Sequence, residues 1–267
     1  MKVWAVAWNT YRGLLHNRAL LALSLFFLFI FVSSAGGIYF AARLSEAGAA
    51  EQARRLFAQS IGSLLNTNAV FSFILAAFMG AFVLPGEIKS GTILPTLGRA
   101  LSRSQYLLGL FLGINLLLAT YLLLVAVAAA GLMLWSGVGV EPYLLLGLVY
   151  VVLIANVVAA IAFLFSVLVN PQVALVALAF FLSLGGLAAS IRLVSQVWAE
   201  RVEAVVSYVL PAWGLLHYSD YLQVTRTPAA RSAEFFAVGL AHGLDYLAVF
   251  LLLALFAFRR RSLLPPS

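Results

Sequence analysis

Long apolar stretches, separated by short polar ones, dominate this chain. A helix needs roughly 20 apolar residues, each adding about 1.5 Å, to cross the hydrocarbon core of a bilayer. Six stretches meet or approach this requirement, at residues 19–42, 69–84, 106–135, 143–169, 172–191 and 235–258. Pro85-Gly86 is expected to end the second stretch, and Asn170-Pro171 to close the fourth. The pattern predicts an all-α, polytopic membrane protein with a single transmembrane domain, residues 19–258.

The start of the sixth span is ambiguous in the sequence. The uninterrupted apolar run from Tyr246 to Phe258 would cover only about 20 Å as a helix, which is short for a crossing. A start near Phe235 places His242 and Asp245 inside the membrane, and a start near Leu244 leaves them at the outer surface. Carboxylates inside a membrane are costly and usually functional, so the first alternative makes Asp245 a candidate for a transport path.

The N-terminal residues 1–18 have a different, amphipathic pattern. At 100° per residue, one arc of a helix collects the apolar side chains of Val3, Trp4, Ala7, Trp8, Tyr11, Leu14 and Leu15. The opposite side collects Lys2, Asn9, Arg12 and His16. This division predicts a helix that lies in the interface on the cytoplasmic side of the membrane.

Composition agrees with a membrane protein and excludes several other classes. Hydrophobic residues make up 64% of the 267 residues and charged residues 9%, against about 25% charged in a typical soluble domain. The charged side chains are too few to cover a soluble catalytic domain. The chain has no cysteine, so disulfides and thiolate metal sites are excluded.

The basic residues predict the orientation of the chain. With the N-terminus in the cytoplasm, the inside segments hold Lys2, Arg12, Arg18, Lys89, Arg99, Arg103 and Arg259 to Arg261, against the single acid Glu87. The outside segments, among them 43–68 and 192–243, hold the remaining seven basic residues and the other eight acids, if Asp245 is counted there. This asymmetry predicts that both termini, including the tail 259–267, are cytoplasmic. The net charge of +7 is therefore interpreted as a topology signal, and no nucleic-acid partner is expected.

The segment between the second and third spans, residues 86–105, has the most specific pattern. Together with the residues that follow it, the segment holds nine characteristic residues in this order: Glu87, Gly91, Thr92, Leu97, Arg99, Ser102, Arg103, Gly109 and Gly113. This order resembles the signature of permease subunits in the type-2 ABC exporter family. Ala100 stands where that family usually has proline, and Leu110 where it usually has lysine. Within the family, the resemblance is closest to the branch assigned to multicopper-enzyme and nitrous-oxide-reductase maturation.

The resemblance implies a fold with six spans, an N-terminal interfacial helix and a cytoplasmic coupling helix, in the bacterial cytoplasmic (inner) membrane. It also implies a dimer with a second permease copy or a homologous permease, driven by two ABC ATPase subunits. The residues expected to contact the ATPase are Glu87, Ser90, Gly91, Thr92, Arg99, Ser102 and Arg103. Arg99 and Arg103 are one helical turn apart, so they could pair with acidic groups on one partner surface.

No nucleotide or cofactor site is expected in this chain, and no catalytic residue. The string nearest to a phosphate-binding loop, Gly86 to Ser90, lacks the glycine before Lys89. ATP and Mg are therefore expected on the partner ATPase. The three histidines are too far apart in sequence for a metal motif.

Several residues within the spans are candidates for other roles. Asn115, Asn156, His242 and Asp245 are possible members of a translocation path. Gly109 and Gly113 form a small-xxx-small pattern that lets two helices approach closely.

Two other functions remain open. An ion-coupled secondary transporter usually has carboxylates at mid-membrane, and spans one to five have none in their interiors. A membrane anchor or mechanical subunit of a periplasmic enzyme-maturation complex fits the same branch of the family. Membrane lipids are expected around the protein in each case, and the sequence does not indicate a transported substrate.

Overall fold

The computed structural model describes residues 2–44, 50–91, 93, 101–135, 142–191 and 233–260. The described residues form seven α-helices: α1 (Lys2–Leu15), α2 (Arg18–Leu44), α3 (Ala50–Lys89), α5 (Arg103–Trp135), α6 (Pro142–Leu168), α7 (Pro171–Ile191) and α10 (Ala233–Arg260). The predicted all-α class is confirmed.

Four of these helices contain segments that are long and apolar enough to cross a membrane. The segments are Gln59–Lys89, Arg103–Trp135, Leu146–Leu168 and Phe236–Arg260. Two shorter apolar segments, Ser24–Gly37 and Pro171–Ser183, lie in α2 and α7. The chain is thus a helical membrane protein, as its composition predicts, while the number of six spans stays a prediction.

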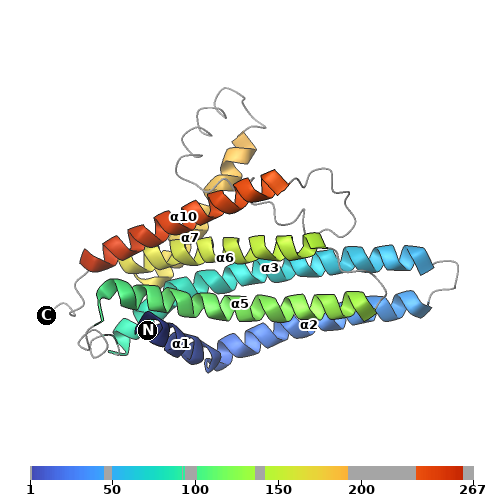
Figure 1. Ribbon diagram of the computed structural model, residues 1–267, viewed down its shortest axis with the longest axis horizontal. Helices are drawn as coiled ribbons and strands as arrows, with labels where there is room; N and C mark the ends of the chain where they lie inside the picture. The colour runs from blue at the N-terminus through green and yellow to red at the C-terminus, as the bar shows by residue number, and fades with distance from the viewer. Residues whose placement is uncertain are drawn as a thin grey trace.

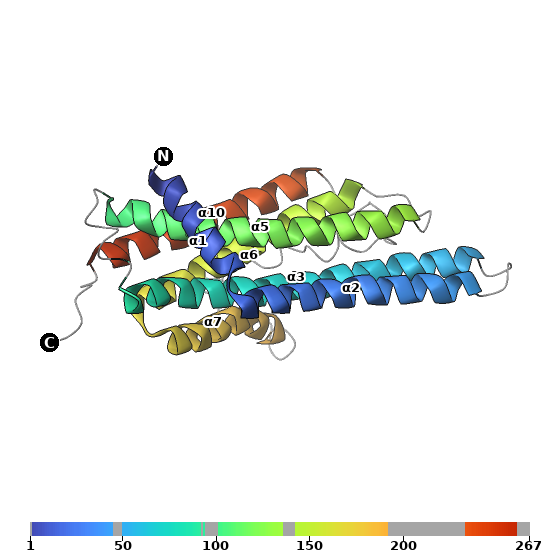
Figure 2. The same ribbon diagram turned by 90° about the horizontal axis from the view of Figure 1, so that it is seen from below.

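Helix α6 occupies the centre of the bundle (Figure 1). It packs against α3, α5, α7 and α10, and most of its apolar side chains are buried. Seen from below, α2 and α3 lie side by side and α1 crosses α5 obliquely (Figure 2). This arrangement leaves the outer faces of α2, α5, α7 and α10 exposing large apolar side chains, as lipid contact requires.

Two glycines allow the helices around α6 to approach closely. A Cβ atom at Gly80 of α3 would lie 2.6 Å from the carbonyl oxygen of Ala159 in α6. A Cβ atom at Gly243 of α10 would lie 2.4 Å from a methyl group of Leu153. At Gly80 the closest atom is backbone, so the absence of a side chain there sets the separation of α3 and α6. At Gly243 the side chain of Leu153 would have to turn away.

The predicted end of the second helix is wrong. Pro85 was expected to end it, but α3 is continuous from Ala50 to Lys89 with Pro85 inside it, while the outside location of residues 43–68 stays a prediction. Proline removes one backbone hydrogen bond without ending this helix, because tertiary contacts hold the turn on both sides of it. Leu84 is buried in the core, and Glu87 accepts a hydrogen bond from α5.

The structure shows where the last helix begins. Helix α10 begins at Ala233, so His242 and Asp245 both lie within it. This corresponds to the longer of the two alternatives, the one that starts near Phe235.

Helix α2 begins at a different level from its neighbours. Arg259, near the end of α10, contacts Ser104 at the start of α5. Leu21, near the start of α2, instead lines the same cavity as Leu117. Thirteen residues of α5 separate Ser104 from Leu117, a rise of about 20 Å. Helix α1 occupies this interval, because it runs along α5 from Gly109 to Thr120.

Candidate functional site

Three helix ends are joined at one end of the bundle, where α3 ends, α5 begins and α10 ends. The hydroxyl group of Tyr106 in α5 donates a hydrogen bond to Oε2 of Glu87 in α3, at 3.2 Å. Nη1 of Arg103 donates to the backbone carbonyl of Arg259 in α10, at 3.1 Å. Nε of Arg259 donates in return to Oγ of Ser104, at 2.9 Å. These bonds connect α5 to both of its neighbours at this end.

The start of α5 is fixed by a capping box. The backbone N–H of Gln105 donates to Oγ of Ser102, and the backbone N–H of Ser102 donates to Oε1 of Gln105, both at 3.2 Å. This reciprocal pair satisfies two backbone donors at the helix N-terminus. Ser102, predicted as a coupling residue, therefore has a structural part as the cap of α5.

The end of α3 is fixed in a comparable way. The backbone N–H of Ser90 donates to the carbonyl of Gly86 at 2.9 Å, and its hydroxyl group donates to the carbonyl of Glu87 at 3.1 Å. Gly91 follows with φ of 74°, a left-handed conformation that glycine adopts without strain. Gly91 thus ends the helix as a C-cap glycine. Thr92 and Arg99 lie outside the described residues, together with most of the segment that joins α3 to α5.

A cavity of about 310 Å³ adjoins the three helix ends. It lies between α1, the end of α3 and the start of α5, with the lining residues Lys2, Ala5, Val6, Asn9, Thr10, Glu87, Leu101, Tyr106 and Leu110. The lining includes a cation, Lys2, and an anion, Glu87. The space is open and its wall is mixed, with charged groups beside apolar side chains, so it is suited to a group that has both a polar and an apolar part.

Gly109 and Gly113 bring α1 onto α5 at the same end. A Cβ atom at Gly109 would lie 2.6 Å from Cβ of Val6, and one at Gly113 would lie 2.6 Å from Cβ of Thr10. The apolar face expected for this helix is divided: Ala7 is buried, whereas Trp4 and Trp8 stay exposed. The helix therefore packs along α5 through its small residues and presents its large aromatic residues outward.

The residues proposed for a translocation path lie on three helices, α5, α6 and α10. Asn115 donates to the carbonyl of Phe111 at 2.9 Å, and Asn156 to that of Val152 at 2.8 Å, each within its own helix. The ring of His242 packs edge-on against Tyr246, with centroids 4.8 Å apart.

Asp245 is exposed, on the face of α10 opposite to the one that contacts α6. Asp245 lies two positions after Gly243, so the two residues are about 200° apart around the helix axis. Within the described part of the chain, no group of three His, Asp or Glu side chains is placed to hold a metal ion.

Sequence reasoning missed Tyr106 and Arg259 as members of this site. Tyr106 was counted only as the first residue of an apolar span, and Arg259 only as a topology charge. A tyrosine at the polar end of a span, three residues after an arginine, is a signal that could have identified the first of them.

Comparison with known proteins gives no family for the chain. Neither the protein-family models nor the curated proteins contain a match.

Proposed function

We propose that this chain is the transmembrane permease subunit of an ATP-driven ABC transporter, resembling the type-2 exporters. In this proposal a separate ATPase subunit hydrolyses ATP, and the segment between α3 and α5 receives its motion. The observation that supports the proposal best is the hydrogen-bonded connection of α3, α5 and α10 at the two ends of that segment.

The segment between α3 and α5 must transmit force from the ATPase to the helices. A loop that moves independently of its helices would dissipate the displacement made by an ATPase. Here the segment leaves α3 at a glycine cap and enters α5 at a capping box, so both attachments are ordered. A displacement of this segment would therefore move the start of α5, and with it α10 through Arg103 and Arg259.

Helix α1 would follow the same displacement. Its contacts with Gly109 and Gly113 lie on the second and third turns of α5, close to the attachment point. Because these contacts are made by backbone and short side chains, α1 cannot move far relative to α5 without a clash. A motion applied at one segment would thus reach four helices.

The remaining parts of the proposal come from the resemblance and from the charge pattern. The chain would cross the bacterial inner membrane six times, with both termini in the cytoplasm, and would pair with a second copy or a homologous permease. ATP and Mg would bind to the two ATPase subunits, and the complex would export its substrate.

Purification of the tagged chain in mild detergent from its natural host tests this function. We expect an ATPase subunit to co-purify and to hydrolyse ATP, and the lone polypeptide to bind no ATP. Saturable binding of ATP to the lone polypeptide would contradict the proposal.

Charge reversal at the segment gives a second test. Arg99→Glu is expected to reduce the amount of co-purified ATPase without affecting membrane insertion, because the charge lies outside the bilayer. Arg103→Glu should add to this loss, but it also removes the bond to α10, so Arg99→Glu is the cleaner variant. Arg260→Glu, an equal charge change at the end of α10, is the matched control. If the Arg99→Glu variant retains the normal amount of ATPase, the segment does not bind the ATPase and its basic residues only set the topology of the chain.

A further inference from the structure

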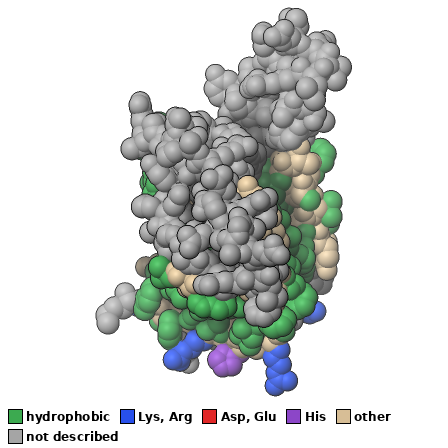
Figure 3. All heavy atoms as spheres, turned by 90° about the vertical axis from the view of Figure 1, so that its right-hand side faces the viewer, with side chains coloured by type: hydrophobic (Ala, Val, Ile, Leu, Met, Phe, Trp, Pro, Cys, Tyr) green, Lys and Arg blue, Asp and Glu red, His purple; other side chains and the backbone are tan. Residues whose placement is uncertain are grey.

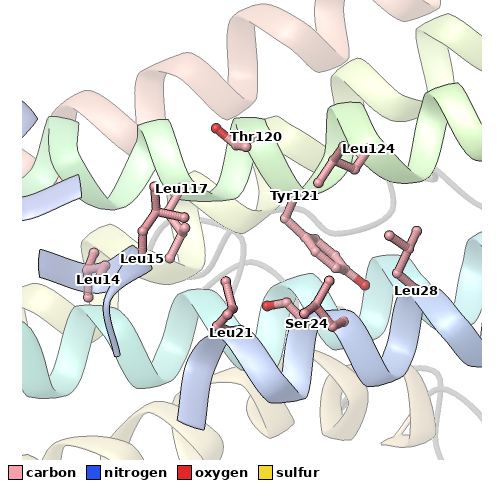
Figure 4. A pocket seen from close by; sticks show the side chains of 10 residues that line it. Leu14, Leu15, Leu21, Ser24, Leu28, Leu117, Thr120, Tyr121 and Leu124 are labelled. Atoms are coloured by element: carbon pink, nitrogen blue, oxygen red, sulfur yellow. The ribbon is translucent and has the colours of Figure 1, made fainter. Parts of the chain in front are cut away.

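A narrow apolar slot lies between α1, α2 and α5 (Figure 4). It has a volume of about 80 Å³, and ten residues line it: Leu14, Leu15, Leu21, Ser24, Leu25, Leu28, Leu117, Thr120, Tyr121 and Leu124. Leu21, Ser24 and Leu28 extend from α2 toward the side chains of α5 in Figure 4. Leucine makes up most of the wall, so the slot is suited to a hydrocarbon chain.

The hydroxyl groups of the α5 wall already have hydrogen-bond partners. Tyr121 donates to Oδ1 of Asn68 at 2.6 Å, on α3. Thr120 donates to the carbonyl of Leu116 at 2.7 Å and also lies 3.2 Å from the hydroxyl group of Tyr11. A polar ligand would have to break these bonds, whereas an alkyl chain would not.

The slot is open to the surroundings of the bundle. Leu21, Leu25 and Leu124 on its rim are each about half exposed, at 44%, 53% and 49%. In a membrane protein, the surface around an apolar rim of this kind is lipid. An acyl chain can therefore enter the slot from the side.

Basic residues stand at the end of the slot where α1 meets α2. Arg18, Leu21, Leu25 and Leu28 follow the three-and-four spacing of a single helix face, so Arg18 begins the stripe that forms the α2 wall. On α1, Arg12 precedes the slot residue Leu15 by three positions and therefore shares its face. Both arginines are exposed.

A basic and aromatic pair on α1 indicates that this end of the slot lies at the level of lipid headgroups. The guanidinium group of Arg12 lies over the exposed ring of Trp8, 5.2 Å from its centroid, and such basic and aromatic pairs are typical of a membrane interface. In the end view of Figure 3, Lys, Arg and His side chains gather along the lower edge, the side of α1 and α2 in Figure 1, so basic side chains lie on the outside of the bundle there. The first 44 residues contain no acidic residue, so an anion there would meet no repulsion from them.

We propose that the slot binds one anionic phospholipid of the adjacent leaflet, with an acyl chain between α2 and α5 and its phosphate between Arg12 and Arg18. Guanidinium groups bind phosphate through paired hydrogen bonds. The headgroup is anionic, because a zwitterionic lipid brings an ammonium group into a region of purely positive charge. The proposal is independent of the ABC function, since it concerns the permease chain alone.

Thermal unfolding of the purified chain in detergent, with added lipid, tests the headgroup. We expect phosphatidylglycerol to raise the unfolding temperature more than phosphatidylcholine with the same acyl chains. The double variant R12Q/R18Q should lose most of this difference, and R260Q, which removes a charge elsewhere, should keep it. Equal stabilisation by the two lipids, or an unchanged preference in R12Q/R18Q, would overturn the anionic headgroup site.

A pair of serine substitutions tests the slot. Ser24→Phe fills the slot from α2, whereas Ser33→Phe places the same ring on the opposite, exposed face of the same helix. Native mass spectrometry should show loss of retained phosphatidylglycerol in the first variant and retention in the second. Equal retention in both would overturn the slot as the acyl site.

A second variant at Ser24 and a ligand without acyl chains complete the test. If Ser24→Phe does not fold, Ser24→Leu fills less of the slot and serves in its place. Glycerophosphoglycerol, which has the headgroup without acyl chains, should not stabilise the protein at the same concentration; stabilisation equal to that of the lipid would show a phosphate site with no use of the slot. No ATPase is present in any of these experiments, so their failure would leave the proposed transport function untouched.

Discussion

The hydroxyl group of Tyr121 donates a hydrogen bond of 2.6 Å to Oδ1 of Asn68, joining α5 to α3 inside the apolar core. Asn68 is almost fully buried, and its Nδ2 donates to the carbonyl of Leu64 within α3. The ring of Tyr121 also packs edge-on against Phe71, with centroids 5.4 Å apart. The pair thus fixes the register of two long helices at a point where no water could replace the bond.

Replacing Tyr121 with phenylalanine is expected to lower the free energy of unfolding by about 1 kcal/mol, since polar contacts between membrane helices contribute about that much. The ring contact with Phe71 would remain, so the loss reports the hydroxyl group. Thermal unfolding in detergent measures it. Tyr11→Phe, whose hydroxyl group pairs with Thr120 in a less buried place, is the control and should cost less. Equal, negligible effects would show that the buried pair contributes nothing.

Gly80→Ala is expected to destabilise the protein by about 1–3 kcal/mol, the usual cost of an extra group in a packed interior. The new Cβ would meet the carbonyl oxygen of Ala159, which is backbone and cannot move without shifting α6. Gly131→Ala in α5, where a Cβ has open space, should be neutral or slightly stabilising because alanine favours the helix. Unfolding curves for both variants compare them, and equal stability would show that α3 and α6 can separate freely.

Glu87→Gln is expected to weaken the association with the ATPase subunit less than Arg99→Glu does. The amide oxygen of glutamine can still accept the hydrogen bond from Tyr106, so the join between α3 and α5 stays and only the charge is lost. The amount of co-purified ATPase measures the effect. A larger loss from Glu87→Gln than from Arg99→Glu would place the main ionic contact at Glu87 itself.

Asp245 is expected to face water, at the dimer's central cavity or the outer gate, because a carboxylate exposed to lipid at this depth would cost about 2–3 kcal/mol. Val238, Asp245 and Leu252 are all exposed and lie seven residues apart on one face of α10. Single cysteines at these positions form a depth series, since the chain has no native cysteine.

A membrane-impermeant thiol reagent added outside should modify the cysteines at 238 and 245 but not the one at 252. Labelling at 238 with protection at 245 would place Asp245 in lipid or in protein packing, and would remove it from the transport path.

The starts of two helices carry local signals in the sequence. Ser102 and Gln105 form the capping pattern at the start of α5, and Asn170 caps α7, accepting the backbone N–H of Val173 at 2.9 Å. Pro85 misled the prediction because a proline marks a helix end only when nothing else holds the next turn. There, burial of Leu84 and the bond between Tyr106 and Glu87 outweigh the local preference.

Contacts between helices could not be predicted in the same way. The spacing of Gly109 and Gly113 shows that something approaches α5 closely, but it does not show that α1 is the partner. Asn115 and Asn156 were expected to bond to a neighbouring helix or to line a path, but the sequence does not show which acceptor an amide in a span will use. The structure gives both of them bonds to the preceding turn of their own helix.

The stagger between α2 and α10 has a consequence for the bilayer itself. Because α2 begins three residues before Leu21, its start is displaced by about 15 Å along α5. This is half the thickness of a hydrocarbon core of about 30 Å, so one flat membrane boundary does not suit both sides of the bundle. Mismatch costs a fraction of a kcal/mol for each ångström, and tilting or local thinning relieves it. Trp4 and Trp8, exposed on α1, lie where such thinning would fall. Reconstitution in lipids of graded chain length should therefore reveal an optimum bilayer thickness for the protein's stability, and a flat dependence would mean that α1 alone compensates for the stagger.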